Sequence, residues 1–290
     1  MNRDLLSLGS LIPPSIILVV YGITAEQSIG RLLIAGIIPG ILHMTLYIIT
    51  VQLLAWFNPS IAPAVPKANW GERISAFGGG LVEVVLVFMI TMGGLLLGWF
   101  TPTEAGAVGA FCLFIITLLR KKMNWEKTIS SLRSSTNLTA QIFFLVASAK
   151  VFGRFIAVSR IPFEFASFIQ SVDIPPFLVV LAIMFISMLL GCIIDAMPLI
   201  LLIIPVFLPV IENLGYDPVW FGIQIVVVCS MGILTPPVGI GIYIIKGIIP
   251  DVPIQNIFKN IWPFLLTDWA FAIILVIFPS IATFLPGLLF

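Results

Sequence analysis

An apolar stretch over residues 229–247 constrains this chain most, because two consecutive prolines, Pro236 and Pro237, stand near its middle. The stretch is apolar enough for a lipid bilayer, yet a proline removes a backbone donor and clashes with the carbonyl four residues earlier. Here the freed carbonyls would be those of Gly232 and Ile233. In hydrocarbon such a break persists only where protein buries it or where it lines a wet cavity. The pattern predicts a broken helix with a binding site or, alternatively, a repaired proline kink or a loop between two short helices.

The same pattern occurs near the N-terminus, at Pro13 and Pro14. Residues 9–15 and 232–238 share four of seven positions, and a glycine precedes the first proline by four residues in both. Each break is followed by an apolar half-helix, a polar turn and a further proline, 26 residues after Pro13 and 27 after Pro236. Paired interruptions at corresponding positions of two halves are the best sequence indication of a transporter's binding site. The repeat therefore favours a site at the interface of two repeats.

The composition places the chain in a membrane. Of its 290 residues 60% are hydrophobic and 9% are charged, and the mean hydropathy is +1.19. These values predict an all-α polytopic membrane protein. The net charge of +1 does not suggest nucleic acid, and the sequence contains no glycine-rich phosphate loop or Ser/His/Asp set that would suggest an enzyme. The one histidine, His43, stands in an apolar segment and is interpreted as a packed residue rather than a metal ligand.

The periodicity and the turn residues predict the order of the elements. Broken helices are expected at 5–21 and 221–249, and apolar spans at 29–57, 81–99, 138–158 and 261–285. Residues 100–105 form an elbow, where Thr101 and Glu104 suit the start of a new helix. Residues 120–133 are the most basic loop, which the positive-inside rule assigns to the cytoplasm.

A re-entrant hairpin is predicted over residues 178–211. The arms on either side of Asp195 and Pro198 hold 13 residues each, or ~20 Å per arm, which is short of the ~30 Å hydrocarbon core. The alternative is two short spans with Asp195 in an aqueous turn. A carboxylate at a hairpin tip is a reasonable place for a cation.

Three further ionisable residues lie in apolar segments. Lys150 and Arg154 are one helical turn apart and either belong to a substrate path or extend toward the membrane interface. Asp268 lies among aromatic residues in the last span, and the sequence assigns it no role.

The internal spacing also predicts an incomplete first repeat. Asp195 precedes Pro236 by 41 residues, and the same spacing counted back from Pro13 falls before Met1. We therefore expect that the first repeat's hairpin is supplied by another polypeptide or is lost, and that this chain alone does not transport. The expected domains are 1–57 (the remainder of the first transport repeat), 58–173 (scaffold helices and basic loop) and 174–290 (the second transport repeat).

Several motifs together resemble one family. Residues 9–16, 100–105 and 232–239, with the later prolines at 263, 279 and 286, are similar to the large membrane subunit of TRAP transporters, the tripartite ATP-independent periplasmic family of dicarboxylate type. The resemblance covers essentially the whole chain and roughly the C-terminal two thirds of such a subunit.

The resemblance implies a function and partners. It implies an inverted-repeat elevator transporter in the bacterial inner membrane that imports an organic acid with sodium as the coupling ion and no other cofactor. The implied partners are a small membrane subunit, a periplasmic binding protein, the organic-acid substrate and lipid. Two alternatives stay open: an inactive truncated or split-gene fragment, and a stand-alone sodium/dicarboxylate symporter.

The resemblance also implies site residues. Pro14, Asp195 and Pro237 would contact substrate. The residues that would hold sodium, partly through their backbone, are Gly9, Ser10, Pro13, Ser15, Gly232, Thr235, Pro236 and Gly239. The sequence does not indicate which acid is carried.

Overall fold

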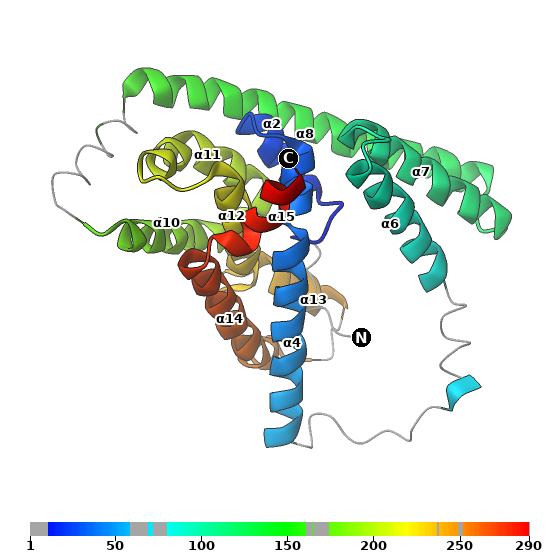
Figure 1. The fold of residues 1–290 in the computed structure, drawn as a ribbon. Helices are drawn as coiled ribbons and strands as arrows, with labels where there is room; N and C mark the ends of the chain where they lie inside the picture. The colour runs from blue at the N-terminus through cyan, green and yellow to red at the C-terminus, as the bar shows by residue number, and fades with distance from the viewer. Residues whose placement is uncertain are drawn as a thin grey trace. The chain divides into compact units, whose positions relative to one another are not determined.

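The computed structural model describes residues 11–58, 69–71, 80–160, 164, 174–236, 238–248 and 252–289, and this part of the chain is helical (Figure 1). Two compact units divide it. The first combines Met1–Leu53 with Phe144–Phe290, and the second is Leu54–Phe143. These units are defined by the contacts between residues. The three domains expected from the sequence, 1–57, 58–173 and 174–290, were defined by their roles in transport, and they stay a prediction.

The first unit is built around α12 (Pro218–Leu234), which buries fifteen of its 17 residues. Helices from both ends of the chain pack on it, with α10 and α11 as its largest neighbours. The other helices of this unit are α2 (Ile16–Thr24), α3 (Ile29–Ala35), α4 (Ile37–Phe57, up to Leu53), α10 (Pro176–Gly191), α11 (Ala196–Asn213), α13 (Ile240–Ile248), α14 (Ile254–Ile277), α15 (Ser280–Leu289) and the second half of α8 (Trp125–Ser159).

The second unit contains α6 (Leu81–Leu96), α7 (Pro102–Leu119) and the first half of α8. The elbow between α6 and α7 forms as predicted. Thr101 and Glu104 make a capping box: the Thr101 N–H donates to Glu104 Oε2 (2.8 Å), and the Glu104 N–H donates to Thr101 Oγ1 (3.3 Å). Two otherwise unpaired donors at the helix start are thereby satisfied, so the structural interpretation of Glu104 is confirmed.

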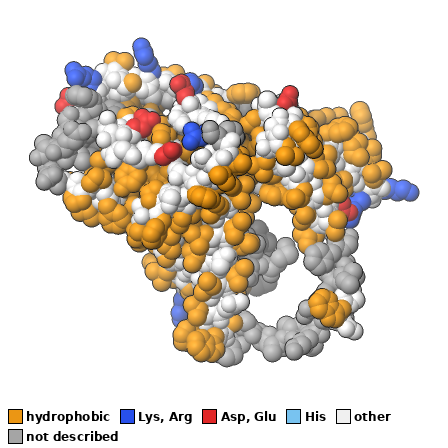
Figure 2. All heavy atoms as spheres, in the orientation of Figure 1, with side chains coloured by type: hydrophobic (Ala, Val, Ile, Leu, Met, Phe, Trp, Pro, Cys, Tyr) orange, Lys and Arg blue, Asp and Glu red, His pale blue; other side chains and the backbone are white. Residues whose placement is uncertain are grey.

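The membrane class is also confirmed. Among the described residues five helices are long and apolar enough to cross a membrane: Ile29–Phe57, Pro102–Leu119, Trp125–Ser159, Ala196–Asn213 and Ile254–Ile277. On the face drawn in Figure 2, hydrophobic side chains predominate and charged side chains are few. Such a surface suits hydrocarbon rather than water.

Two predicted boundaries are wrong. The basic loop is confined to a short turn, because Asn124 Oδ1 accepts the Lys127 N–H at 2.8 Å and α8 begins at Trp125. The last span ends earlier than predicted, since the chain breaks at Phe278–Pro279 between α14 and α15. Asparagine caps and prolines both define helix ends.

The hairpin prediction is corrected in its lengths. Its arms, α10 and α11, hold 16 and 18 residues rather than 13 each. An 18-residue helix is ~27 Å long, so the argument from short arms does not hold for α11. A short turn separates α10 from α11 between Gly191 and Ala196, where the tip was expected, while the re-entrant character of the hairpin stays a prediction.

Candidate functional site

The second proline pair ends α12 and separates it from α13. Thr235 closes α12: its N–H donates to the Gly232 carbonyl (3.0 Å), and its hydroxyl donates to the Met231 carbonyl (2.8 Å). Gly239 then adopts a φ of +58°, a left-handed conformation that favours glycine, immediately before α13 starts. A broken helix is therefore present where the sequence predicts one. Pro237 lies outside the described residues.

One detail of the predicted break is wrong. The proline at 236 was expected to free the Gly232 carbonyl, but this oxygen accepts the Thr235 N–H instead. The last turn tightens to a three-residue bond, which is a common way for a helix end to satisfy its carbonyls. The break is thus partly repaired from within, and the Thr235 hydroxyl is the polar side chain nearest to the exit of α12 along the chain.

The turn between α10 and α11 packs directly on this break. A Cβ at Gly232 would lie 2.6 Å from the Gly191 Cα, so the two backbones touch through paired glycines. The Cys192 thiol lies 3.6 Å from the Pro236 carbonyl oxygen. The predicted neighbourhood of the hairpin and the second break is therefore observed. Asp195 stands at the N-cap position of α11, but its side chain is exposed and makes no capping hydrogen bond.

The first break is described from Leu11 onward, so Gly9 and Ser10 lie outside the described residues. Ser15 is buried and caps α2, with its Oγ accepting the Leu18 N–H at 3.3 Å. Pro13 is buried and Pro14 is exposed. A Cβ at Gly36 would lie 2.7 Å from the Leu11 carbonyl oxygen, so the break packs closely on the junction of α3 and α4.

The two breaks occupy different environments around α12. The helix after the first break, α2, contacts the first turns of α12: the Tyr21 hydroxyl donates to the Pro218 carbonyl at 2.7 Å. The second break is at the opposite end of α12. The turn of the hairpin therefore contacts the second break, at the end of α12. α2 contacts the other end of α12, where this helix begins.

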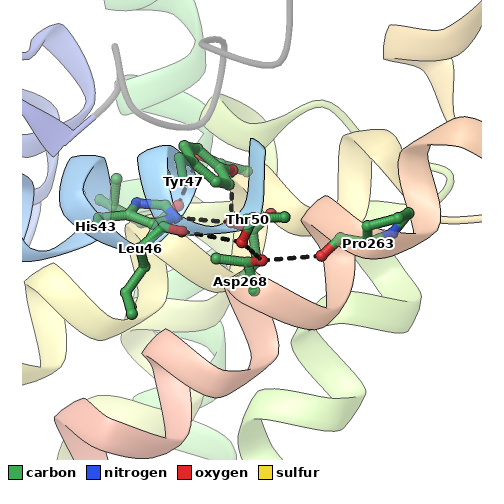
Figure 3. Close-up of polar contacts among 9 residues, drawn as sticks. His43, Leu46, Tyr47, Thr50, Pro263 and Asp268 are labelled. Atoms are coloured by element: carbon green, nitrogen blue, oxygen red, sulfur yellow. Dashed lines mark hydrogen bonds and ion pairs between the residues drawn. The ribbon is translucent and has the colours of Figure 1, made fainter. Parts of the chain in front are cut away.

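A buried polar cluster inside the first unit was missed by sequence reasoning. His43 and Tyr47 on α4 both reach Asp268 on α14 (Figure 3): His43 Nε2 lies 2.7 Å from Asp268 Oδ1, and the Tyr47 hydroxyl donates to the same oxygen at 2.6 Å. His43 and Asp268 are both fully buried. The interpretation of His43 as a packed residue is confirmed, and Asp268 gains defined partners.

A second pair extends the contact between the two helices. The hydroxyls of Thr50 and Thr267 are 2.6 Å apart. His43 and Thr267 both lie four residues after a proline, Pro39 and Pro263. Polar residues at the same offset after these two prolines were the signal that could have identified this cluster in advance.

The two cations singled out in α8 are exposed. Lys150 lines a cavity of about 290 Å³ together with Glu26 and Glu212, at the ends of α2 and α11. Arg154 lies one turn further along α8 and is also exposed. This arrangement is compatible with side chains that extend from the helix toward a polar region.

The fold and the helix break at Pro236 together define the class: a multi-pass helical membrane protein with an interrupted helix. The comparison with known families gives the particular family. Residues 7–281 match the DctM component of the tripartite ATP-independent periplasmic transporters. The chain belongs to this family.

Three curated relatives illustrate the match. The C4-dicarboxylate TRAP transporter large permease of Pseudomonas aeruginosa is 31% identical over 282 residues, which are 97% of this chain and 65% of the relative. The sialic acid TRAP large permease of Vibrio cholerae is 31% identical over 284 residues (97% and 65%). The 2,3-diketo-L-gulonate TRAP large permease of Escherichia coli is 31% identical over 277 residues (94% and 64%). The chain thus spans about 65% of the length of these relatives.

Proposed function

We propose that this chain is a permease component that imports an organic acid across the bacterial inner membrane with sodium as the coupling ion. The observation that carries the proposal is the second break. Here Thr235 ends α12, Gly239 lies just before α13, and the α10–α11 turn packs on the break. The relatives named above carry a C4-dicarboxylate, sialic acid or diketogulonate. All three are carboxylates, which supports an anionic substrate.

The chemistry of the break fits sodium. Sodium is a hard cation that prefers oxygen ligands, as calcium and magnesium do. The break offers the Thr235 hydroxyl and the peptide carbonyls of described residues such as Thr235 and Pro236, and the first break offers the Ser15 hydroxyl. Within the described ranges no group of three His, Cys, Asp or Glu side chains gathers as transition-metal ligands would.

These residues also suit an anion. α11 and α13 both begin beside the second break, at Ala196 and Ile240. The N-terminus of a helix carries partial positive charge, and half-helix N-termini point at substrate carboxylates in many secondary transporters. Bound sodium adds positive charge next to these termini and so strengthens the binding of the acid. Coupling then follows from electrostatic attraction between two neighbouring sites.

The proposed partners are those of the family: a small membrane subunit and a periplasmic binding protein. The test is to reconstitute the chain with both partners in proteoliposomes and to follow labelled C4-dicarboxylate, sialic acid and diketogulonate. We expect uptake of one of them only with an inward sodium gradient and only with the binding protein. Uptake without the binding protein would instead support a stand-alone symporter. Uptake that requires the N-terminal third of a relative's large subunit would show that this chain supplies part of a permease.

One variant tests the second break directly. Thr235→Val keeps the shape of the side chain and removes the hydroxyl that donates to Met231. We expect the sodium concentration for half-maximal uptake to rise about tenfold, the effect of ~1.4 kcal/mol, a typical value for one hydrogen-bonding group. Thr117→Val is the matched control, because the Thr117 hydroxyl donates to Leu113 four residues earlier on an exposed face of α7 (2.9 Å). An equal response of the two variants would remove Thr235 from the sodium site.

A further inference from the structure

The polar cluster between α4 and α14 lies outside both proposed ion sites, and neither site uses it. It joins α4 and α14, the later helices that contain Pro39 and Pro263, and His43 and Asp268 each lie within two turns of these prolines. His43 and Asp268 are separated by 225 residues in the chain yet share a hydrogen bond of 2.7 Å. Each side chain is fully buried, and the Phe271 ring stacks on the imidazole at 4.3 Å.

The hydrogen bonds of this pair are unevenly distributed. A carboxylate accepts up to about four hydrogen bonds, two on each oxygen. Both contacts to Asp268, from His43 and Tyr47, reach Oδ1. Asp268 Oδ2 and His43 Nδ1 are buried and have no hydrogen-bond partner among the described residues. A buried polar atom without a partner costs free energy, so burial of these two atoms lowers the stability of the folded protein unless another interaction offsets the cost.

Binding of a proton lowers the cost of burying this pair. An ionised Asp268 beside a neutral imidazole leaves one net negative charge in an apolar bundle, which is costly at membrane depth. One added proton makes the pair neutral, either as imidazolium with carboxylate or as imidazole with carboxylic acid. The ionisable side chains that contact His43 in the described part are Asp268 from α14 and Tyr47 from α4 itself. These two residues and the imidazole are therefore the groups that share the charge.

We propose that His43 and Asp268 form a proton-binding site that controls how firmly α4 is held to α14. With the proton bound, a charge-assisted hydrogen bond joins the helices. When the proton leaves, one negative charge remains between them and the contact weakens. This proposal rests on the proposed function. The strength of the contact would make the relative movement of α4 and α14, and hence transport, depend on pH. Histidine is suited to this role because its charge ordinarily changes between about pH 5 and 8.

The first test needs no transport, because the chain contains a single histidine. The complete chain is labelled with ¹⁵N-histidine in lipid nanodiscs, and its one imidazole signal is followed by NMR from about pH 5 to pH 9, the range in which histidine is the usual switch. We expect the signal to change within this range. In Asp268→Asn the response of the signal to pH should differ from that of the parent, because the carboxylate that bonds to the imidazole is gone.

Asp217→Asn is the matched control. Asp217 caps α12, a role that asparagine fills equally well, and its carboxylate bonds to Val219 and Trp220 rather than to His43. The control should leave the imidazole signal unchanged. A signal that stays constant over the whole range, or that responds identically in Asp268→Asn and Asp217→Asn, would overturn the proposal.

The second test measures uptake against pH in the reconstituted complex. We expect the rate to vary at least about threefold across the range in which histidine titrates, and to vary less in His43→Gln. A profile identical in parent and variant would overturn the role of the site in transport. Complete absence of uptake at every pH would count against the proposed function, while the NMR titration would still decide on the proton site.

Discussion

α12 and α7 are apolar helices of similar length, 17 and 18 residues, yet they occupy opposite environments. α12 buries fifteen residues within the first unit, whereas α7 buries only Ala105. In a membrane both surfaces are apolar, because lipid tails and core side chains are equally free of charge. Hydropathy therefore identifies both as membrane helices but does not tell a bundle centre from a lipid-facing surface. Close backbone contacts and paired polar groups make the distinction.

The largest expected difference is at glycine. In Gly232→Ala on α12 the new Cβ would lie 2.6 Å from the Gly191 Cα, and backbone on both sides has to move. Overpacking of this kind lowers the free energy of unfolding by ~3 kcal/mol. Thermal unfolding in detergent, followed by size-exclusion chromatography, should show a markedly lower midpoint.

Gly106→Ala on α7 is the control for this prediction. A Cβ at Gly106 meets nothing within 4 Å, and alanine is the better helix former. Its unfolding midpoint should stay level or rise slightly. If both variants lost the same stability, the contrast between buried and exposed helices would be wrong.

A smaller difference is expected at tryptophan. Trp220 on α12 is 0% exposed, and its Nε1–H donates to the Leu275 carbonyl at 2.8 Å, whereas Trp125 on α8 is 80% exposed. Trp220→Phe leaves a buried carbonyl unpaired, at a cost of about 1–3 kcal/mol. Trp125→Phe should stay within about 0.5 kcal/mol of the parent. Chemical unfolding, followed by circular dichroism at a helix-sensitive wavelength, separates the two; equal midpoints would contradict the assigned role of the Trp220 hydrogen bond.

The smallest effect concerns the start of α7, where stability comes from local contacts. Thr101→Ala removes the capping box and should cost ~1 kcal/mol. Its neighbour Thr103→Ala serves as control, because Thr103 is exposed and lies outside the capping box. Hydrogen exchange at the first turn of α7 should accelerate in the first variant alone. Exchange unchanged in Thr101→Ala would show that packing rather than capping holds this helix end.

The contrast between α12 and α7 also explains which predictions succeeded. The elbow at Thr101 and the break at Pro236 were predicted correctly because a cap and a proline act on neighbouring residues. The prediction for the Gly232 carbonyl was wrong, because this oxygen accepts a hydrogen bond from the nearby Thr235 N–H. The arms of the hairpin are longer than expected because α10 extends from Pro176 to Gly191 and α11 extends from Ala196 to Asn213. Local residue types define the exact ends of a helix less closely than they define its presence.

The candidate site was predictable in part. The second break and its contact with the α10–α11 turn were expected from the repeat and the resemblance. The roles of Ser15 and Thr235 as sodium ligands remain predictions, and the substrate role of Asp195 rests on an exposed side chain. The sequence singled out Lys150, and its two possible roles stay predictions; its place beside Glu26 and Glu212 became visible only from the packing of α2, α8 and α11.

The sequence by itself determined the membrane class, the break at Pro236, the capped elbow and the family, because each depends on residue type and on spacings within a few turns. Only the tertiary structure decided that Gly191 meets Gly232 and that His43 meets Asp268 across 225 positions. The physical reason is that hydrophobicity draws every apolar helix out of water without selecting its neighbour. Which helices meet depends on close packing of small residues and on pairing of buried polar groups, and both are properties of two surfaces at once.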